Sequence, residues 1–139
     1  MKTHFYFTQD FESYTPFWHL FTNGNDFKII FQNDSDYIFG MNILAVCACL
    51  FPDVKILTFV LMSNHIHFIL SGEEKRCKEL FECFKWKLSR GLYKNISNWK
   101  NFQATLAPIG DEDYLRTAIA YVNRNAYVAH PQFTPYNYQ

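Results

Sequence analysis

Apolar positions along this chain alternate between short runs typical of strands and spaced repeats typical of helices. Four runs rich in aromatic and β-branched residues predict strands, at residues 18–22, 54–62, 65–70 and 102–109. Three segments carry apolar residues at helical intervals and predict helices, the first from Asp34 or Ser35 to just before Pro52, the others at residues 73–94 and 112–125.

Two short polar breaks predict how neighbouring segments connect. Asn23-Gly24-Asn25-Asp26 has strong turn chemistry, so we expect residues 27–31 to resume as an extended, hairpin-like run. Ser63-Asn64 separates two strands so closely that they should pair antiparallel.

The predicted order is β-α-β-β-α-β-α, with two directly connected strands between helices. This order fits an α+β, ferredoxin-like split β-α-β sandwich, with helices packed on an antiparallel sheet. The 139 residues are 49% hydrophobic, enough for a substantial core, so we expect one domain over residues 1–139. The segment after about residue 130, rich in Pro and Tyr, is expected to be loosely ordered.

Charge and cysteine content restrict the function classes. Thirteen basic and thirteen acidic residues cancel, so any phosphate-binding surface must be local. The four cysteines lack zinc-ribbon spacing and are expected to be reduced thiols. No basic and apolar leader begins the chain and no apolar run reaches membrane-spanning length, so we expect a cytoplasmic protein without a membrane partner.

The segment Thr58–Leu70 contains two histidines, His65 and His67, in an otherwise apolar context. On a strand, residues two apart share a face, so both imidazoles would project together while the intervening residues enter a core. Paired neutral imidazoles can hold a divalent metal. The alternative is a chance His-x-His in which each ring is only a half-buried polar group with one hydrogen bond.

The last predicted helix brings Tyr121 and Asn125 onto one side. The two residues are four apart, and they flank the apolar stripe formed by Leu115, Ala118 and Val122. A hydroxyl and a carboxamide would then lie together at the edge of the packed face. Alternatively, Tyr121 is an ordinary boundary residue and Asn125 an ordinary residue near the helix end.

Together, these two motifs resemble the HUH-type single-tyrosine transposases, particularly the REP-associated tyrosine transposases. In that family a strand ends in a pattern similar to Leu61-Met62-Ser63-Asn64-His65-Ile66-His67, with Pro usual in place of Ser63. A later helix carries Tyr followed four residues on by Asn or Gln, as in Tyr121-Val122-Asn123-Arg124-Asn125, after an acidic lead-in resembling Asp111-Glu112-Asp113. The likeness spans about residues 17–129.

The resemblance implies a metal-dependent DNA strand-transfer enzyme. Tyr121 would be the nucleophile that forms a 5′-phosphotyrosine link and frees a 3′-hydroxyl. His65, His67 and Asn125 would bind Mg²⁺ or Mn²⁺, and the substrate would be single-stranded or hairpin DNA. Relatives include monomers and dimers, so a homodimer is one expected assembly.

The cations best placed by sequence to meet phosphates are on two helices: Lys85, Lys87, Arg90, Arg116 and Arg124. Exposed aromatics such as Trp86, Trp99 or Tyr93 could stack unpaired bases. The alternative for the cations is an ordinary solvated helix face.

Two other functions stay open on sequence alone. One is a non-catalytic domain that binds single-stranded or hairpin nucleic acid and has lost transesterification, as a decayed copy would. The other is a metal-dependent hydrolase in which water, not Tyr121, attacks the phosphodiester.

Overall fold

The computed structural model describes residues 16–25, 29–92 and 99–129, the last five of these by their backbone alone. Several predicted features therefore lie outside the described residues: the segment after residue 130, the first part of the 27–31 run, Tyr93 and the side chain of Asn125.

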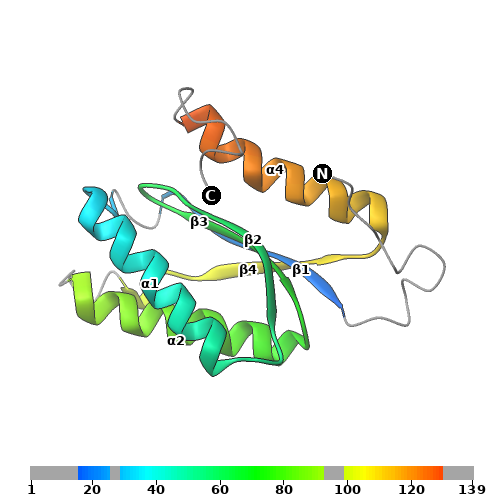
Figure 1. The fold of residues 1–139 in the computed structure, drawn as a ribbon, viewed down its shortest axis with the longest axis horizontal. Helices are drawn as coiled ribbons and strands as arrows, with labels where there is room; N and C mark the ends of the chain where they lie inside the picture. Colours follow the sequence, from blue (N-terminus) through cyan, green and yellow to red (C-terminus); the bar gives the residue numbers. More distant parts are fainter. Residues whose placement is uncertain (1–15, 26–28, 93–98, 130–139) are drawn as a thin grey trace.

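Four strands and three helices make up the described fold (Figure 1). In chain order they are β1 (Phe17–Thr22), α1 (Asp34–Leu50), β2 (Lys55–Leu61), β3 (Ile66–Ser71), α2 (Glu74–Leu92), β4 (Ala104–Ile109) and α4 (Glu112–Ala129). The strands form one antiparallel sheet in the order β2-β3-β1-β4.

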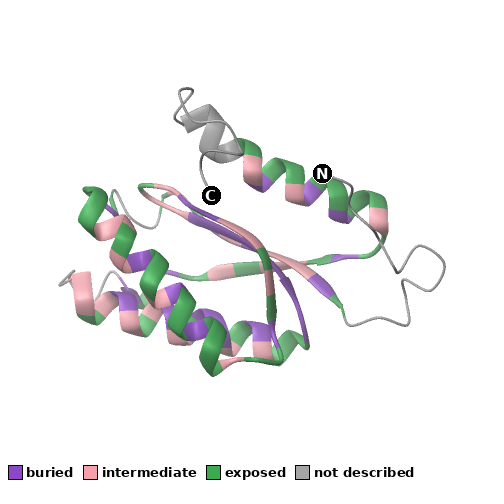
Figure 2. Cartoon of the chain, in the orientation of Figure 1, coloured by how far each residue is buried: buried purple, intermediate pink, exposed green. Residues whose placement is uncertain are grey.

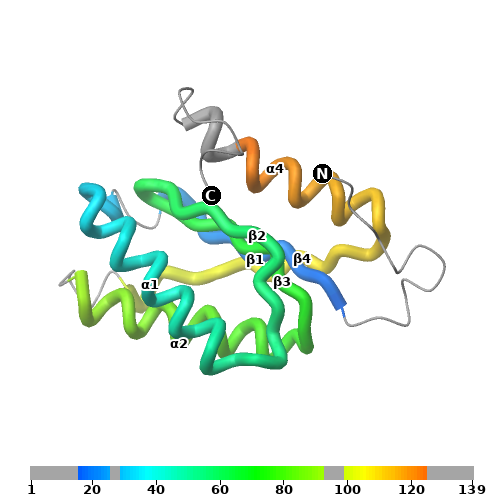
Figure 3. Tube along the Cα trace, viewed as in Figure 1, coloured from blue at the N-terminus to red at the C-terminus, as the bar shows by residue number. Residues whose placement is uncertain are grey.

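This strand order consists of two interleaved split β-α-β units. β3 lies between β1 and β2, the strands that α1 connects, and β1 lies between β3 and β4, the strands that α2 connects. Right-handed crossovers place both helices on the same face of the sheet, where Figure 3 shows α1 beside α2. The predicted α+β, ferredoxin-like architecture is confirmed.

α4 lies across the opposite face of the sheet, so the sheet has helices on both sides (Figure 1). Leu115, Ala118 and Val122 point from α4 into a small apolar cluster with Val60 and Ile69. The apolar stripe predicted for this helix therefore packs on the sheet as expected. The helix itself continues to Ala129, beyond the predicted end at residue 125.

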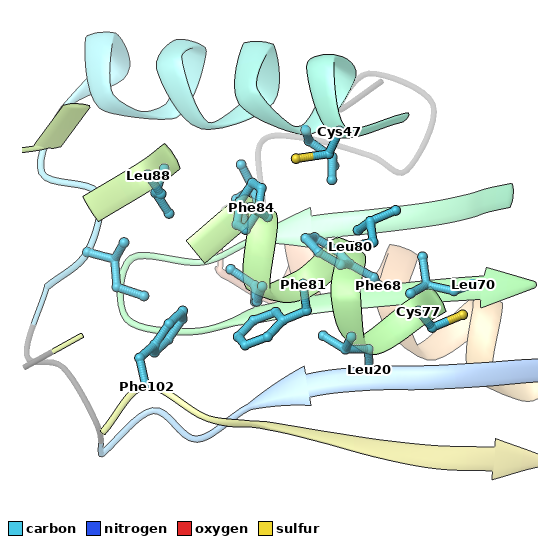
Figure 4. Close-up of a cluster of buried hydrophobic side chains, with 14 of the residues drawn as sticks. Leu20, Cys47, Phe68, Leu70, Cys77, Leu80, Phe81, Phe84, Leu88 and Phe102 are labelled. Atoms are coloured by element: carbon cyan, nitrogen blue, oxygen red, sulfur yellow. The ribbon is translucent and has the colours of Figure 1, made fainter. Parts of the chain in front are cut away.

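The larger core fills the space between the sheet and the α1/α2 layer. Figure 2 shows buried residues concentrated there, and Figure 4 shows Phe68 and Leu70 of β3 in one cluster with Phe81 and Phe84 of α2. Phe68 and Phe84 meet edge to face at 5.3 Å between ring centroids. All four cysteines are free, and Cys47 and Cys77 belong to this core.

Two local predictions are wrong. Ile29, Ile30 and Phe31 form no strand; instead the backbone N–H groups of Ile30 and Phe31 both donate to the carbonyl of Ser63. The α1 N-cap is Asn33, whose side chain accepts from Asp36 N–H, and not Asp34 or Ser35. In both cases the backbone groups are satisfied by partners that the sequence pattern does not reveal.

Among the helices that the structure describes, none combines the length and apolar character needed to cross a membrane.

Gly40 allows α1 to approach the sheet closely, because an added Cβ would stand 2.7 Å from the ring of buried Phe31 and 3.1 Å from Leu61. We expect Gly40→Ala to lower the free energy of unfolding by about 1–3 kcal/mol through overpacking, despite the better helix propensity of Ala. Gly110→Ala is the matched control, since its Cβ would meet nothing within 4 Å. Urea denaturation measures both, and equal stability of the two variants would contradict the close approach.

Candidate functional site

β3 supports the site because all six of its residues are buried and alternate between two environments. Ile66, Phe68 and Leu70 face the large core, while His67 and Ile69 face α4. His67 is only 6% exposed, an unusual position for an imidazole. The apolar backing predicted for the histidine pair is present.

His65 lies one residue before β3, in the turn that connects β2 to β3. Met62 N–H donates to the carbonyl of His65 and closes this turn. The rings of His65 and His67 approach to 5.1 Å between centroids, so the structure brings the two histidines together although only one is on the strand.

Asn64 orients the ring of His65. Its Nδ2 donates to the carbonyl of Gly24 at 3.1 Å, and its Oδ1 lies 2.7 Å from His65 Nδ1. Because the Asn64 carboxamide oxygen can only accept, His65 must donate from Nδ1, which leaves its Nε2 with a lone pair. The sequence predicts that Asn64 shapes the turn between the two strands, but it does not indicate this bond to His65.

A third imidazole, His19 of β1, completes a cluster that the sequence patterns did not reveal. His19 Nε2 lies 3.0 Å from His67 Nδ1, and the two rings are nearly parallel with centroids 5.2 Å apart. His19 precedes His67 by 48 residues, and β1 pairs with β3 so that Phe21 faces His67 across the ladder. The only signal in the sequence was a histidine within a predicted strand.

Tyr121 stands beside this cluster on α4. Its ring centroid is 5.6 Å from that of His67 and 6.1 Å from that of His19, in edge-on arrangements. The residue is 52% exposed, so its phenol is accessible from solvent as well as close to the imidazoles. The flanking position predicted for Tyr121 is the one observed.

A hydrogen bond at the sheet edge fixes the rotation of α4 about its axis. Thr58 of β2 donates through Oγ1 to Asn123 Oδ1 at 2.7 Å. Asn123 is two residues beyond Tyr121, so this bond and the apolar contacts of Val122 set the direction in which the phenol points.

Burial determines the protonation state of the cluster. Burial, together with repulsion from any positive charge on the neighbouring His19 and His65, lowers the pKa of His67 to about 4. Burial also lowers the pKa of His19 and of His65. All three imidazoles are therefore neutral at pH 7, the form that binds metals.

The described residues supply only part of a metal-ligand set. Among them, no group of three or more His, Cys, Asp or Glu side chains is arranged to hold an ion. His65 and His67 are the two candidate imidazole ligands, and the described residues bring no third His, Cys, Asp or Glu side chain into position with them. Asn125 belongs to α4 one turn beyond Tyr121, but its side chain lies outside the described part of the chain, so its role as a ligand stays a prediction.

The five cations predicted to meet phosphates fall on two different layers. Arg116 and Arg124 are exposed on α4, the helix of Tyr121, and Arg116 also pairs with Glu112 one turn earlier.

The three cations of α2 are on the sheet face opposite the imidazoles (Figure 1). Lys85 donates to the carbonyl of Phe102 at 3.1 Å and pairs with Glu82, and its side chain is only 13% exposed. Lys87 is half-buried, and Arg90 lies over the exposed ring of Trp86. The structure therefore does not bring these three together with Tyr121.

Comparison with solved structures identifies the architecture. A REP-associated tyrosine transposase bound to a REP hairpin superposes with a TM-score of 0.64 at 14% identity, covering 94% of this chain and 74% of that one. A candidate transposase from Deinococcus radiodurans gives a TM-score of 0.52 at 14% identity, covering 90% of this chain and 97% of that one. Neither a protein-family model nor a curated protein matches the sequence.

The chain has the fold of a tyrosine transposase. The family resemblance inferred from the motifs at residues 61–67 and 121–125 is thus confirmed at the level of the fold.

The lowered pKa of His67 predicts an acid-sensitive fold. As the pH falls from 7 to 4, the unfolded chain binds a proton near the ordinary pKa of 6.5 while the folded ring resists it. The free energy of unfolding should therefore fall by about 2–3 kcal/mol from this residue in metal-free buffer. His67→Asn cannot titrate but keeps a hydrogen-bond donor near the position of Nδ1. Its free energy of unfolding, measured by urea denaturation, should fall less steeply with decreasing pH than that of the wild-type protein. Parallel declines in the two proteins would contradict this assignment.

Proposed function

We propose that this protein cleaves and rejoins single-stranded or hairpin DNA, with Tyr121 as the nucleophile and a divalent metal held by His65 and His67. The observation that carries the proposal is the position of an exposed phenol 5.6 Å, ring to ring, from a buried neutral imidazole that is paired with a second one. The transposase-like fold supports it.

The donor chemistry of this cluster suits a divalent ion. The Asn64 hydrogen bond leaves a lone pair on His65 Nε2, and no described residue hydrogen bonds to Nε2 of either His65 or His67. Asn125, one turn beyond Tyr121, is our proposed third ligand through its side-chain oxygen. Bound Mg²⁺ or Mn²⁺ would supply positive charge to the non-bridging oxygens of the scissile phosphate and to the leaving oxygen.

The proposed reaction conserves the phosphodiester bond energy. Tyr121 Oη forms a bond to phosphorus as the bond from phosphorus to the 3′ oxygen breaks, giving a 5′-phosphotyrosine and a free 3′-hydroxyl. The phenolic proton leaves to solvent or a nearby base, and the departing 3′ oxygen gains a proton. Rejoining reverses these steps with a new 3′-hydroxyl.

DNA would approach Tyr121 along the exposed side of α4. Arg124 is one turn beyond Tyr121, and Arg116 is on the preceding turns, so phosphates on either side of the cleaved bond could reach a cation. The REP hairpin in the similar solved structure suggests hairpin oligonucleotides as the first substrates to test.

The test of the nucleophile is covalent capture. The full chain is incubated with Mn²⁺ and labelled hairpin oligonucleotides from sequence flanking its own gene, and shifted bands are mapped by mass spectrometry. Tyr121→Phe should reduce the adduct by at least about 100-fold, because the attacking oxygen is gone. Tyr114→Phe is the matched control, since Tyr114 is similarly exposed two turns earlier on the same helix. Cleavage that persists in Tyr121→Phe would instead indicate a hydrolase with water as the nucleophile.

The metal role is tested by removing each proposed imidazole ligand. His65→Ala and His67→Ala should each reduce Mn²⁺-dependent cleavage by about 100-fold or more, because charge stabilisation is lost. Circular dichroism checks that the variants stay folded. Full activity in both variants would contradict the proposed metal site. If the wild-type protein retains the hairpin but forms no adduct, the result would favour a binding domain that has lost catalysis.

A further inference from the structure

Of the three imidazoles in the cluster, His19 alone has no role in the proposed reaction. It comes from β1, in the middle of the sheet, and its Nε2 lies 3.0 Å from Nδ1 of His67. The two rings are nearly parallel, at 27°, with centroids 5.2 Å apart, so the hydrogen bond runs close to the plane of both rings.

His65 shows what such a partner does in this site. Its Nδ1 is held by Asn64 Oδ1, and the Asn64 orientation is set in turn by the bond from Nδ2 to the carbonyl of Gly24. The tautomer of His65 is thereby determined before any ligand arrives.

The contact between His19 and His67 contains one proton, which either ring can donate. Only if His67 donates from Nδ1 does its Nε2 keep the lone pair that a metal ligand needs. The opposite arrangement would place a hydrogen on Nε2 and block it.

We infer that His19 is a positioning residue that accepts the Nδ1–H of His67, fixing the ring orientation and tautomer so that Nε2 of His67 keeps its lone pair, as Nε2 of His65 does. This inference deepens the proposed function, on which its metal-binding part rests. His19 and Asn64 would then act as equivalent outer partners, one for each ligating imidazole.

The burial of His67 makes this role physically necessary. A ring that is 6% exposed cannot exchange its Nδ1 partner for bulk water, so losing His19 would leave a buried donor unsatisfied or let the ring turn. Outer partners of metal-bound histidines typically change metal affinity by about 10–100-fold when removed.

The tautomer is tested on the metal-free protein by long-range ¹H–¹⁵N correlation of the histidine rings. We expect His67 and His65 both to carry the proton on Nδ1 in the wild-type protein. In His19→Leu, the His67 signals should change while those of His65 stay the same. A proton on Nε2 of His67 in the wild-type protein would overturn the inference.

Affinity is tested by titrating Mn²⁺ and following the free ion by electron paramagnetic resonance. His19→Leu should weaken binding by about 10–100-fold. His19→Gln should stay within about threefold, because a glutamine oxygen can stand near the position of Nε2 and accept the same bond. Phe21→Leu, which removes a ring packed against His19 at 4.9 Å but no hydrogen bond, should also stay within about threefold.

Equal affinity in wild type and His19→Leu would overturn the role of His19 in metal binding. If His19→Leu fails to fold, the wild-type tautomer and the His19→Gln affinity still decide. A wild-type protein that binds no Mn²⁺ yet carries the expected His67 tautomer would count against the proposed metal site and not against the contact between His19 and His67.

Discussion

The site depends on β3 being buried on both of its faces. Helices α1 and α2 cover one face of the sheet and α4 covers the other, so every side chain from Ile66 to Ser71 is shielded from water. Strand alternation then assigns Phe68 to the large core and His67 to the α4 side. A one-residue slip in the pairing of β3 would exchange these environments and bury the imidazole among phenylalanines.

Burying an imidazole is unfavourable unless its nitrogens have partners, and the fold supplies one partner from a neighbouring strand and one from the adjacent turn. His19 contacts His67 from the neighbouring strand, and Asn64 contacts His65 from the turn. The same burial keeps the rings neutral at pH 7, since it lowers the pKa of each. One physical cause, exclusion of water by α4 and the sheet, thus underlies both the expected acid sensitivity of the fold and the neutral imidazoles that the proposed metal site requires.

α4 packs on the sheet with one side and presents Tyr121, the proposed nucleophile, on another. Leu115 and Val122 hold the helix on the sheet, and the bond between Thr58 and Asn123 fixes its rotation. Tyr121 is therefore presented at the edge of the packed stripe, half exposed and within ring-contact range of His67. The proposed nucleophile is on a rigid, packed helix and needs no large rearrangement to keep its place beside the imidazoles.

The sequence alone determined the fold class and the order of elements, because strand alternation and helical periodicity are local properties of the chain. It also predicted that His65 and His67 lie together, although His65 is in the turn before β3 and not on the strand. The same periodicity placed Tyr121 correctly at the flank of its helix. Only the tertiary structure revealed His19, the Asn64 bond to Gly24 and the separation of Lys85 from the site. These features depend on strand register and on which face each helix covers. The two hydrogen bonds, from His19 to His67 and from Asn64 to Gly24, join residues 40 or more positions apart in the sequence. The strand predicted to include residues 29–31 likewise does not form. The backbone N–H groups of Ile30 and Phe31 instead donate to the carbonyl of Ser63, over 30 residues later in the chain.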